Sequence, residues 1–214
     1  MVAVKVYIAP VLDAPVRPVW PEARQAQLDA TKNDAHRKAR YQVWRLLEYA
    51  LRDGFGLELP QLQLTLKDGK WSCPQCFFSL SHSHQAVAVA VSQQPVGIDI
   101  EPVRPLRREL ETKLLGDGEL AECRLLSDED ACAYLLRKWC EKESVFKLGN
   151  EALYRPRMVT PGELTRVVTA QLPDGAYCLA VASRSPEAMM LKSDWDLAQL
   201  REIYGGDMPN PGNL

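Results

Sequence analysis

Residues 86–101 read AVAVAVSQQPVGIDIE, an alternating apolar run that ends in two acids. The alternation predicts two strands, QAVAVAVS and QPVGIDI, paired as a hairpin around Gln93 and Gln94. Residues two apart in a strand point to the same face, so Asp99 and Glu101 should lie side by side. Two like charges on one face repel unless a cation or a shared proton lies between them. The pair is therefore either a solvated strand end or part of a metal site.

The flanking sequence predicts an α+β chain. Apolar periodicity indicates helices in the low 20s after Pro21, over 34–53, from about 127 to 148, and over 193–205. The second of these should end just before Gly54, and the third should begin with a capping box of Ser127 and Asp130. Further strands are expected over 2–8, 62–66, 76–80, 165–172 and 176–183. Each half, 1–102 and 103–214, thus carries one long helix and several antiparallel strands, which favours two α+β subdomains.

Composition limits the classes of function. The 214 residues are 46% hydrophobic and 25% charged, as in globular proteins, with a net charge of -2. This balance disfavours wholesale binding to nucleic acid or to an anionic membrane. The sequence has no apolar run of bilayer length and no signal peptide, so a cytoplasmic location is expected. Cys73 and Cys76 have C-x-x-C spacing and are either reduced loop cysteines or half of a zinc site.

A third carboxylate lies in RKWCEKESVFK, residues 137–147. Trp139, Glu143 and Lys147 follow each other at intervals of four and form one stripe on the predicted helix. Taken alone, the stripe suits an inward Trp beside an exposed Glu143–Lys147 pair. If the helix packs on the sheet, however, Glu143 faces the two acids of GIDIE, and three carboxylates make an oxygen site for Mg2+. Lysine beside such a site suits phosphoryl transfer.

The stretch FFSLSHSHQ, residues 77–85, places Ser81 and His82 before the first strand of the alternating run. A lone histidine there is often structural. The predicted pairing nevertheless puts His82 in the same sheet as the acids, near one cleft.

Together, VGIDIE, RKWCEKESVFK and FSLSHS resemble the three signatures of the Sfp-type 4'-phosphopantetheinyl transferases. They match the family's G-I-D-I-E segment, its W-x-x-K-E-x-x-x-K helix and its F-N-[IL]-S-H-S strand entry, in the same order. With DAHRKAR upstream, the resemblance covers nearly the whole chain.

The resemblance implies a pseudo-twofold α+β fold with its active site between two similar halves, each an antiparallel sheet on one long helix. It implies a monomeric enzyme that moves the 4'-phosphopantetheine arm of coenzyme A onto a serine of an acyl, peptidyl or aryl carrier protein, releasing 3',5'-ADP. The partner would be a carrier of fatty acid, polyketide or nonribosomal peptide synthesis.

The same resemblance implies roles for single residues. Asp99, Glu101 and Glu143 would hold Mg2+, and Glu143 would also act as the base for the carrier serine. Lys147 would stabilise or protonate the leaving phosphate. The residues expected to contact coenzyme A are Ser81, His82, Lys70, Arg24 and Arg37.

Three departures from the family pattern are visible. Ser79 replaces the usual Asn, Trp71 follows Lys70 where Pro is common, and WPEAR lacks a second basic residue beside Arg24. Two other functions suit parts of the pattern. A metal-dependent nuclease would use the same acids and lysine, although it usually carries a basic face. A binding module for coenzyme A or a carrier would keep the fold without turnover.

Overall fold

The computed structural model describes residues 4–83, 85–104, 108–149, 154–162, 165–171, 177–185 and 189–204. Its strands are β1 (Val4–Pro10), β2 (Thr65–Lys67), β3 (Lys70–Ser72), β4 (Phe77–His82), β5 (Ala86–Ser92), β6 (Val96–Pro102), β7 (Arg166–Gln171), β8 (Tyr177–Ser183) and β9 (Met189–Lys192). Its α-helices are α1 (Glu22–Asp29), α2 (Asp34–Phe55), α3 (Glu111–Leu114), α4 (Asp117–Cys123), α5 (Asp128–Leu148) and α6 (Leu197–Tyr204). Short 3-10 turns cover Leu59–Gln61, Arg108–Leu110 and Pro156–Met158.

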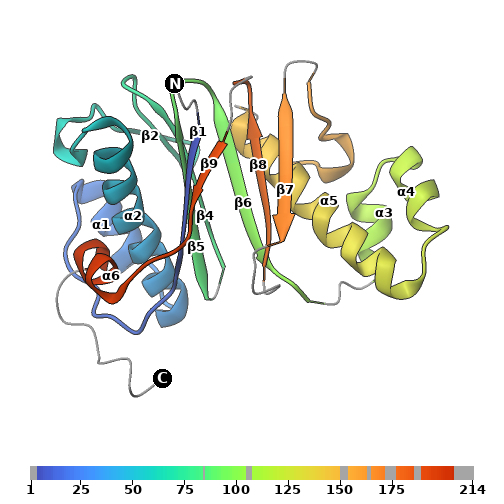
Figure 1. Ribbon diagram of the computed structural model, residues 1–214, viewed down its shortest axis with the longest axis horizontal. Helices are drawn as coiled ribbons and strands as arrows, with labels where there is room; N and C mark the ends of the chain where they lie inside the picture. Colours follow the sequence, from blue (N-terminus) through green and yellow to red (C-terminus); the bar gives the residue numbers. More distant parts are fainter. Residues whose placement is uncertain are drawn as a thin grey trace.

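The molecule is built in four layers, helix, sheet, sheet and helix (Figure 1). One sheet has the order β4-β5-β1-β9 and carries α2 on its outer face, and the other has the order β6-β8-β7 and carries α5. A small third sheet pairs β2 with β3. The prediction of an α+β fold is confirmed, with one long helix on each main sheet. One pairing departs from the expected antiparallel pattern, because β9 runs parallel to β1.

The alternation of β5 decides how the layers stack. Every residue of β5 is buried. Its valines belong to the core beneath α2, and its alanines belong to a second core shared with β6 and β8. Large side chains thus fill the space under the helix, while small ones face the opposing sheet. The strand therefore serves two cores, which explains why AVAVAVS has no polar face.

The predicted hairpin between the two strands of residues 86–101 is wrong. β5 pairs with β1 and β4, whereas β6 pairs antiparallel with β8, with Asp99 opposite Ala180. The three residues of QQP, 93–95, carry the chain from one sheet to the other instead of closing a turn between ladder partners. Periodicity identifies each strand but does not specify its partner.

Two serines of β4 join the sheets. The backbone N–H of Ile98 donates to Ser79 Oγ at 3.1 Å, and that of Ile100 donates to Ser81 Oγ at 3.3 Å. Serine hydroxyls therefore replace the carbonyls that a neighbouring strand would offer to β6. The substitution of Ser79 for the family's Asn keeps an acceptor at this junction.

The chain returns to its first sheet at the C-terminal end. After β8, strand β9 joins the edge of β1, and α6 packs on α2. The Tyr204 hydroxyl donates to Pro10 O at 3.0 Å, and Arg45 Nε donates to Ile203 O at 3.0 Å. The sheet of β7 and β8 takes its third strand, β6, from the first half of the sequence. The boundary at 102 and 103 stays a prediction, and the two halves exchange strands across it.

Capping explains the ends of the long helices. Asn33 Oδ1 accepts from His36 N at the start of α2. Ser127 Oγ accepts from Asp130 N at the start of α5, and this second cap is the one that the sequence predicted. The helix α2 continues through Gly54, however, and ends at Gly56, whose φ of 65° suits a glycine cap.

None of the helices in the described part of the chain combines the length and apolar character needed to cross a bilayer.

Candidate active site

The motif residues meet in a pocket of about 340 Å³ where the end of β4, strand β6 and helix α5 come together. Its lining is mostly polar: Leu80, Ser81, His82, Asp99, Glu101, Trp139, Glu143 and Lys147. Six of the nine predicted site residues therefore share one pocket, although they come from three separate segments.

Gly97 sets the approach of α5 to β6. A Cβ at this position would lie 1.9 Å from the Ser144 carbonyl oxygen and 2.6 Å from Leu148 N. The helix backbone therefore passes directly over the strand, and only glycine fits beneath it. This close contact brings Glu143 and Lys147 of the helix over the acids two and four residues further along β6.

Lys147 is the centre of the polar contacts. Its Nζ donates to Asp99 Oδ1 at 2.7 Å and to Ser81 Oγ at 3.2 Å, and Ser81 Oγ also donates to Asp99 Oδ1 at 2.8 Å. Lys147 thus pairs across the pocket with β6, and the exposed Glu143–Lys147 pair considered from sequence is not the partnership observed. Asp99 is only 3% exposed, so the ammonium compensates a charge that water does not reach.

The carboxylates carry more negative charge than this one lysine offsets. Asp99 Oδ2 is buried and has no hydrogen-bond partner among the described residues. The pKa of Glu101 is raised by burial and then by the charge of Asp99, and the pKa of Glu143 is also raised, by burial and by Asp99. Within the described ranges, no group of three His, Cys, Asp or Glu side chains is arranged closely enough to hold a metal ion. The three acids share the pocket without converging on one point.

Tyr154 is a site residue that sequence reasoning missed. Its hydroxyl oxygen is buried, and its ring lies 4.9 Å from that of Phe146. Its pKa is raised by burial and by the negative charges of Glu143 and Asp99, which places it beside them. No local pattern in LGNEALY indicates this position.

Positive charge gathers on the His82 side of the pocket. The pKa of His82 is lowered to about 4, by removal of the ring from water and then by the charges of Arg40, Lys147 and Arg24. Arg24 is 5% exposed, donates to Arg40 O at 2.5 Å, and has a pKa lowered to about 10 by burial and by Arg40. Arg40 was not predicted. Arg40 follows His36 by four residues on α2, so the two side chains share one face of the helix. The charge of His36 also lowers the pKa of His82, and this spacing is the sequence signal for the face that lies near the pocket.

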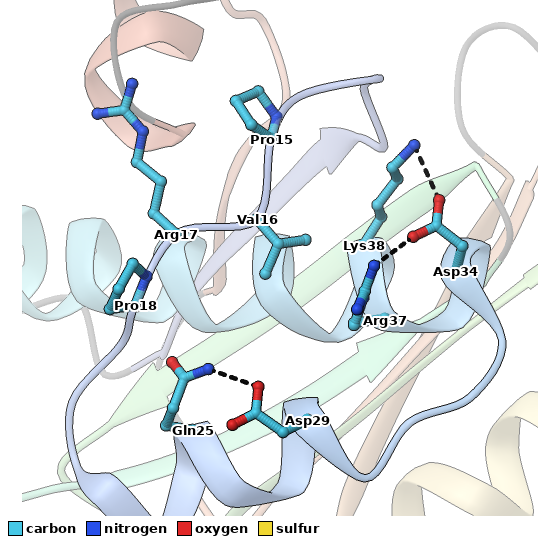
Figure 2. A pocket seen from close by; sticks show the side chains of 9 residues that line it. All are labelled: Pro15, Val16, Arg17, Pro18, Gln25, Asp29, Asp34, Arg37 and Lys38. Atoms are coloured by element: carbon cyan, nitrogen blue, oxygen red, sulfur yellow. Dashed lines mark hydrogen bonds and ion pairs between the residues drawn. The ribbon is translucent and has the colours of Figure 1, made fainter.

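Arg37 lies elsewhere. It lines a separate cavity of about 490 Å³ between the 15–18 loop, α1 and the start of α2. Figure 2 shows Arg37 and Lys38 both bound to Asp34, at 2.7 and 3.1 Å. The structure therefore does not place Arg37 among the cations near His82. Arg37 follows His36, which does act on His82, by one residue, and one residue along a helix changes the direction of the side chain by about 100°.

Lys70 reaches the end of α5. Its Nζ donates to the carbonyl oxygens of Lys147 at 2.5 Å and Gly149 at 2.9 Å, which are among the carbonyls that a helix end leaves without partners. Burial lowers its pKa. The neighbouring Trp71 is buried, donates to Gln27 and stacks 5.3 Å from Trp44, so the residue that replaces Pro anchors this strand in the core.

Comparisons with known proteins agree with this arrangement. Residues 95–195, which include β6 and all of α5, match the model of the 4'-phosphopantetheinyl transferase superfamily. The chain matches the model of this superfamily over 101 of its 214 residues. It is 28% identical over 162 residues to the 4'-phosphopantetheinyl transferase psf-1 of Bacillus pumilus, covering 67% of this chain and 70% of that protein. It is 26% identical over 153 residues to the 4'-phosphopantetheinyl transferase Sfp of Bacillus subtilis (strain 168), covering 67% and 66%.

The chain thus spans about two thirds of the length of the curated relatives that it matches. The predicted family is confirmed, and with it the class of enzyme, a phosphopantetheinyl transferase rather than a nuclease.

Proposed function

We propose that this chain transfers the 4'-phosphopantetheine arm of coenzyme A onto a serine of a carrier protein, releasing 3',5'-ADP. The observation that carries the proposal is the pocket in which Asp99, Glu101 and Glu143 face Lys147 and Ser81 at the edge of a cationic cluster. Such a pocket has acids on one side and cations on the other. The cations can offset the charge of a pyrophosphate substrate, and an acid can accept the proton of the nucleophile.

The cationic cluster of Arg24 and Arg40, with the neutral ring of His82 beside it, suits the phosphates of coenzyme A. Arg40 is only partly buried and has a guanidinium that can bind a phosphate with two parallel hydrogen bonds, whereas the Arg24 guanidinium is buried over Trp44 and donates to Gln27 and to Arg40 O. Arg40 would supply the second basic contact that WPEAR lacks. Lys70 is held by carbonyls of α5, so its contribution is to fix the end of the helix that carries Lys147.

The acidic side of the pocket has the donor chemistry for a divalent cation, although its three carboxylates do not converge on one point and would have to move together to bind it. Asp99 offers a buried oxygen with no partner in the described residues, and burial raises the pKa of both Glu101 and Glu143, so a nearby positive charge would stabilise all three. An all-oxygen donor set is the one that Mg2+ prefers. When bound there by Asp99, Glu101 and Glu143, Mg2+ would offset the charge of the pyrophosphate.

Glu143 is the group suited to accept the proton of the carrier serine. Its raised pKa makes it a stronger base than an exposed glutamate. As the serine oxygen bonds to the phosphorus that carries the pantetheine arm, the bond from that phosphorus to the bridging oxygen breaks. The electron pair leaves with 3',5'-ADP, and Lys147 stabilises the new charge or donates a proton to it.

An intact-mass assay tests the proposal. Coenzyme A, Mg2+ and a purified apo-carrier should give a carrier heavier by about 340 Da, the mass of the transferred arm. Glu143→Gln should abolish this addition while the unfolding midpoint stays close to that of the parent chain. If the folded protein binds coenzyme A but adds no mass to any of several unrelated carriers, the transferase proposal is wrong and the chain is a binding module.

The natural carrier, the monomeric state and the cytoplasmic location stay predictions. Parallel assays with fatty-acid, polyketide and nonribosomal-peptide carriers address the first, and light scattering of the purified chain addresses the second.

A further inference from the structure

The C-x-x-C segment forms a feature of its own outside the pocket. Cys73 and Cys76 flank a turn that connects β3 to β4, and their sulfur atoms lie 3.6 Å apart. Cys73 Sγ also lies 3.4 Å from the Cys76 carbonyl oxygen, so its side chain folds back over the turn. Both cysteines are reduced in this structure. A disulfide needs sulfurs about 2.0 Å apart, a distance that small side-chain rotations can reach from here.

The two thiols differ in access. Cys73 is partly exposed, and the intervening Pro74 and Gln75 are exposed, so a reagent can approach Cys73 from solvent across the turn. Cys76 is 4% exposed and packs in the core beneath α2. A bond between them would therefore have an accessible attacking sulfur and a protected resolving sulfur, the asymmetry that thiol–disulfide exchange uses.

The local polar contacts favour thiolate on the same sulfur. The contact between the two sulfurs, together with the backbone amides of Cys76 and Gln75, lowers the pKa of Cys73. The pKa of Cys76 is raised by the neighbouring Cys73 sulfur and by burial.

We propose that Cys73 and Cys76 form a reversible thiol–disulfide couple, in which Cys73 reacts first and Cys76 resolves. The oxidant is a low-molecular-weight disulfide. The Cys73 thiolate attacks one of its sulfurs, forming a mixed disulfide and releasing one thiolate. Cys76 then loses its proton and attacks the Cys73 sulfur, which forms the internal disulfide and releases the second thiolate. Two cysteines are oxidised and one external disulfide is reduced to two thiols.

The couple is placed where it would act on the transferase. It closes the connection between β3, whose Lys70 binds the end of α5, and β4, which carries Ser81 and His82. Oxidation would fasten these two strands at their shared turn.

Thiol counting on the full chain tests the proposal. After incubation with oxidised glutathione and alkylation of the remaining thiols, the parent chain should carry four alkyl groups instead of six, and dithiothreitol should restore six. Peptide mapping should find the bond between Cys73 and Cys76. The Cys76→Ser variant should retain one glutathione on Cys73, whereas the Cys73→Ser variant should retain none at Cys76.

Cys132, the other partly exposed cysteine, gives the matched control. Cys132→Ser should lose two alkylation sites on oxidation, as the parent does. Six alkylated thiols after oxidation, a bond that involves other cysteines, or glutathione trapped on Cys76 in the Cys73→Ser variant would each overturn the proposal. So would zinc that stays bound through dialysis and prevents oxidation. None of these outcomes depends on transfer to a carrier.

Discussion

Lys147 Nζ lies 2.7 Å from Asp99 Oδ1, so the lysine of the long C-terminal helix is the direct counter-ion of the buried acid on β6. The pair joins the helix and the strand that together hold the proposed chemistry. It also means that a metal bound by Asp99 would share this carboxylate with the ammonium.

Lys147→Met should lower the rate of phosphopantetheine transfer by about 10²-fold, because a charge facing the leaving phosphate is lost. The same change leaves the carboxylate of Asp99 buried without its cation, so the free energy of unfolding should fall by about 3 kcal/mol. Single-turnover transfer and urea unfolding measure the two effects. The Lys147→Met/Asp99→Asn double variant should recover stability without recovering transfer. Equal instability in both variants would show that the ion pair is not the cause.

Gly97→Ala should disrupt the packing of α5 on β6. Its Cβ would meet backbone atoms of the helix, which cannot rotate away, so we expect a loss of about 3 kcal/mol in unfolding free energy. Gly118→Ala is the matched control, because no atom lies within 4 Å of its new Cβ. This helical substitution should change stability by about 1 kcal/mol or less. Denaturant curves that coincide for the two variants would contradict the close packing.

Arg40→Ala should weaken coenzyme A binding by about tenfold or more, since one charge-assisted contact to a phosphate is worth about 1.5–3 kcal/mol. Arg37→Ala, three residues earlier on the same helix, should bind nearly as the parent does, because Arg37 lines the other cavity. Isothermal titration calorimetry at low and moderate salt compares the two. A larger loss of coenzyme A affinity in Arg37→Ala than in Arg40→Ala would show that Arg37, and not Arg40, binds the phosphate.

Binding of coenzyme A should take up a proton at His82. Burial and neighbouring cations lower the pKa of the ligand-free ring to about 4, so it is neutral at pH 6, and an adjacent phosphate would raise this pKa. A group with a higher pKa in the bound state favours binding at lower pH. Affinity should therefore rise as the pH falls below the bound-state pKa and level off below about 4. Calorimetry in two buffers of different ionisation enthalpy should show smaller proton uptake for His82→Gln.

Ser79→Ala should remove the acceptor for Ile98 N and leave a buried amide unsatisfied, at a cost of about 1–3 kcal/mol. Ser72→Ala serves as its control. Ser72 is exposed and its hydroxyl bonds only across the small sheet to Thr65, so this change should cost about 0.5 kcal/mol or less. A neutral Ser79→Ala result would mean that the serine does not carry the contact between the sheets.

Patterns of neighbouring residues predicted those features of the fold that depend on neighbouring residues alone. The cap of Ser127, the alternation in β5 and the stripe of Glu143 and Lys147 each depend on neighbours in sequence, and the corresponding elements are present. The three motif segments also meet in one pocket, as the packing of α5 on β6 requires.

The errors concern contacts between distant segments. The partner of β6 is β8, about 80 residues away, and the strand β9 returns to β1 from the far end of the chain. Tyr154 lies beside Glu143, and the sequence before it carries no periodic signal. The predicted contact Arg37 lines the other cavity and stays a prediction, while Arg40, which was not predicted, lies near His82; the i, i+4 spacing of His36 and Arg40 is the signal that could have pointed to it.

The serine junction has a consequence for how the two halves respond to heat and to substrate. Ser81 is both an acceptor for the β6 backbone and a wall of the pocket, so the contact that joins the sheets is shared with the site where coenzyme A would bind. Ligand binding and sheet association are then thermodynamically linked. Neither half should melt by itself, and coenzyme A should raise the melting temperature of a single calorimetric transition.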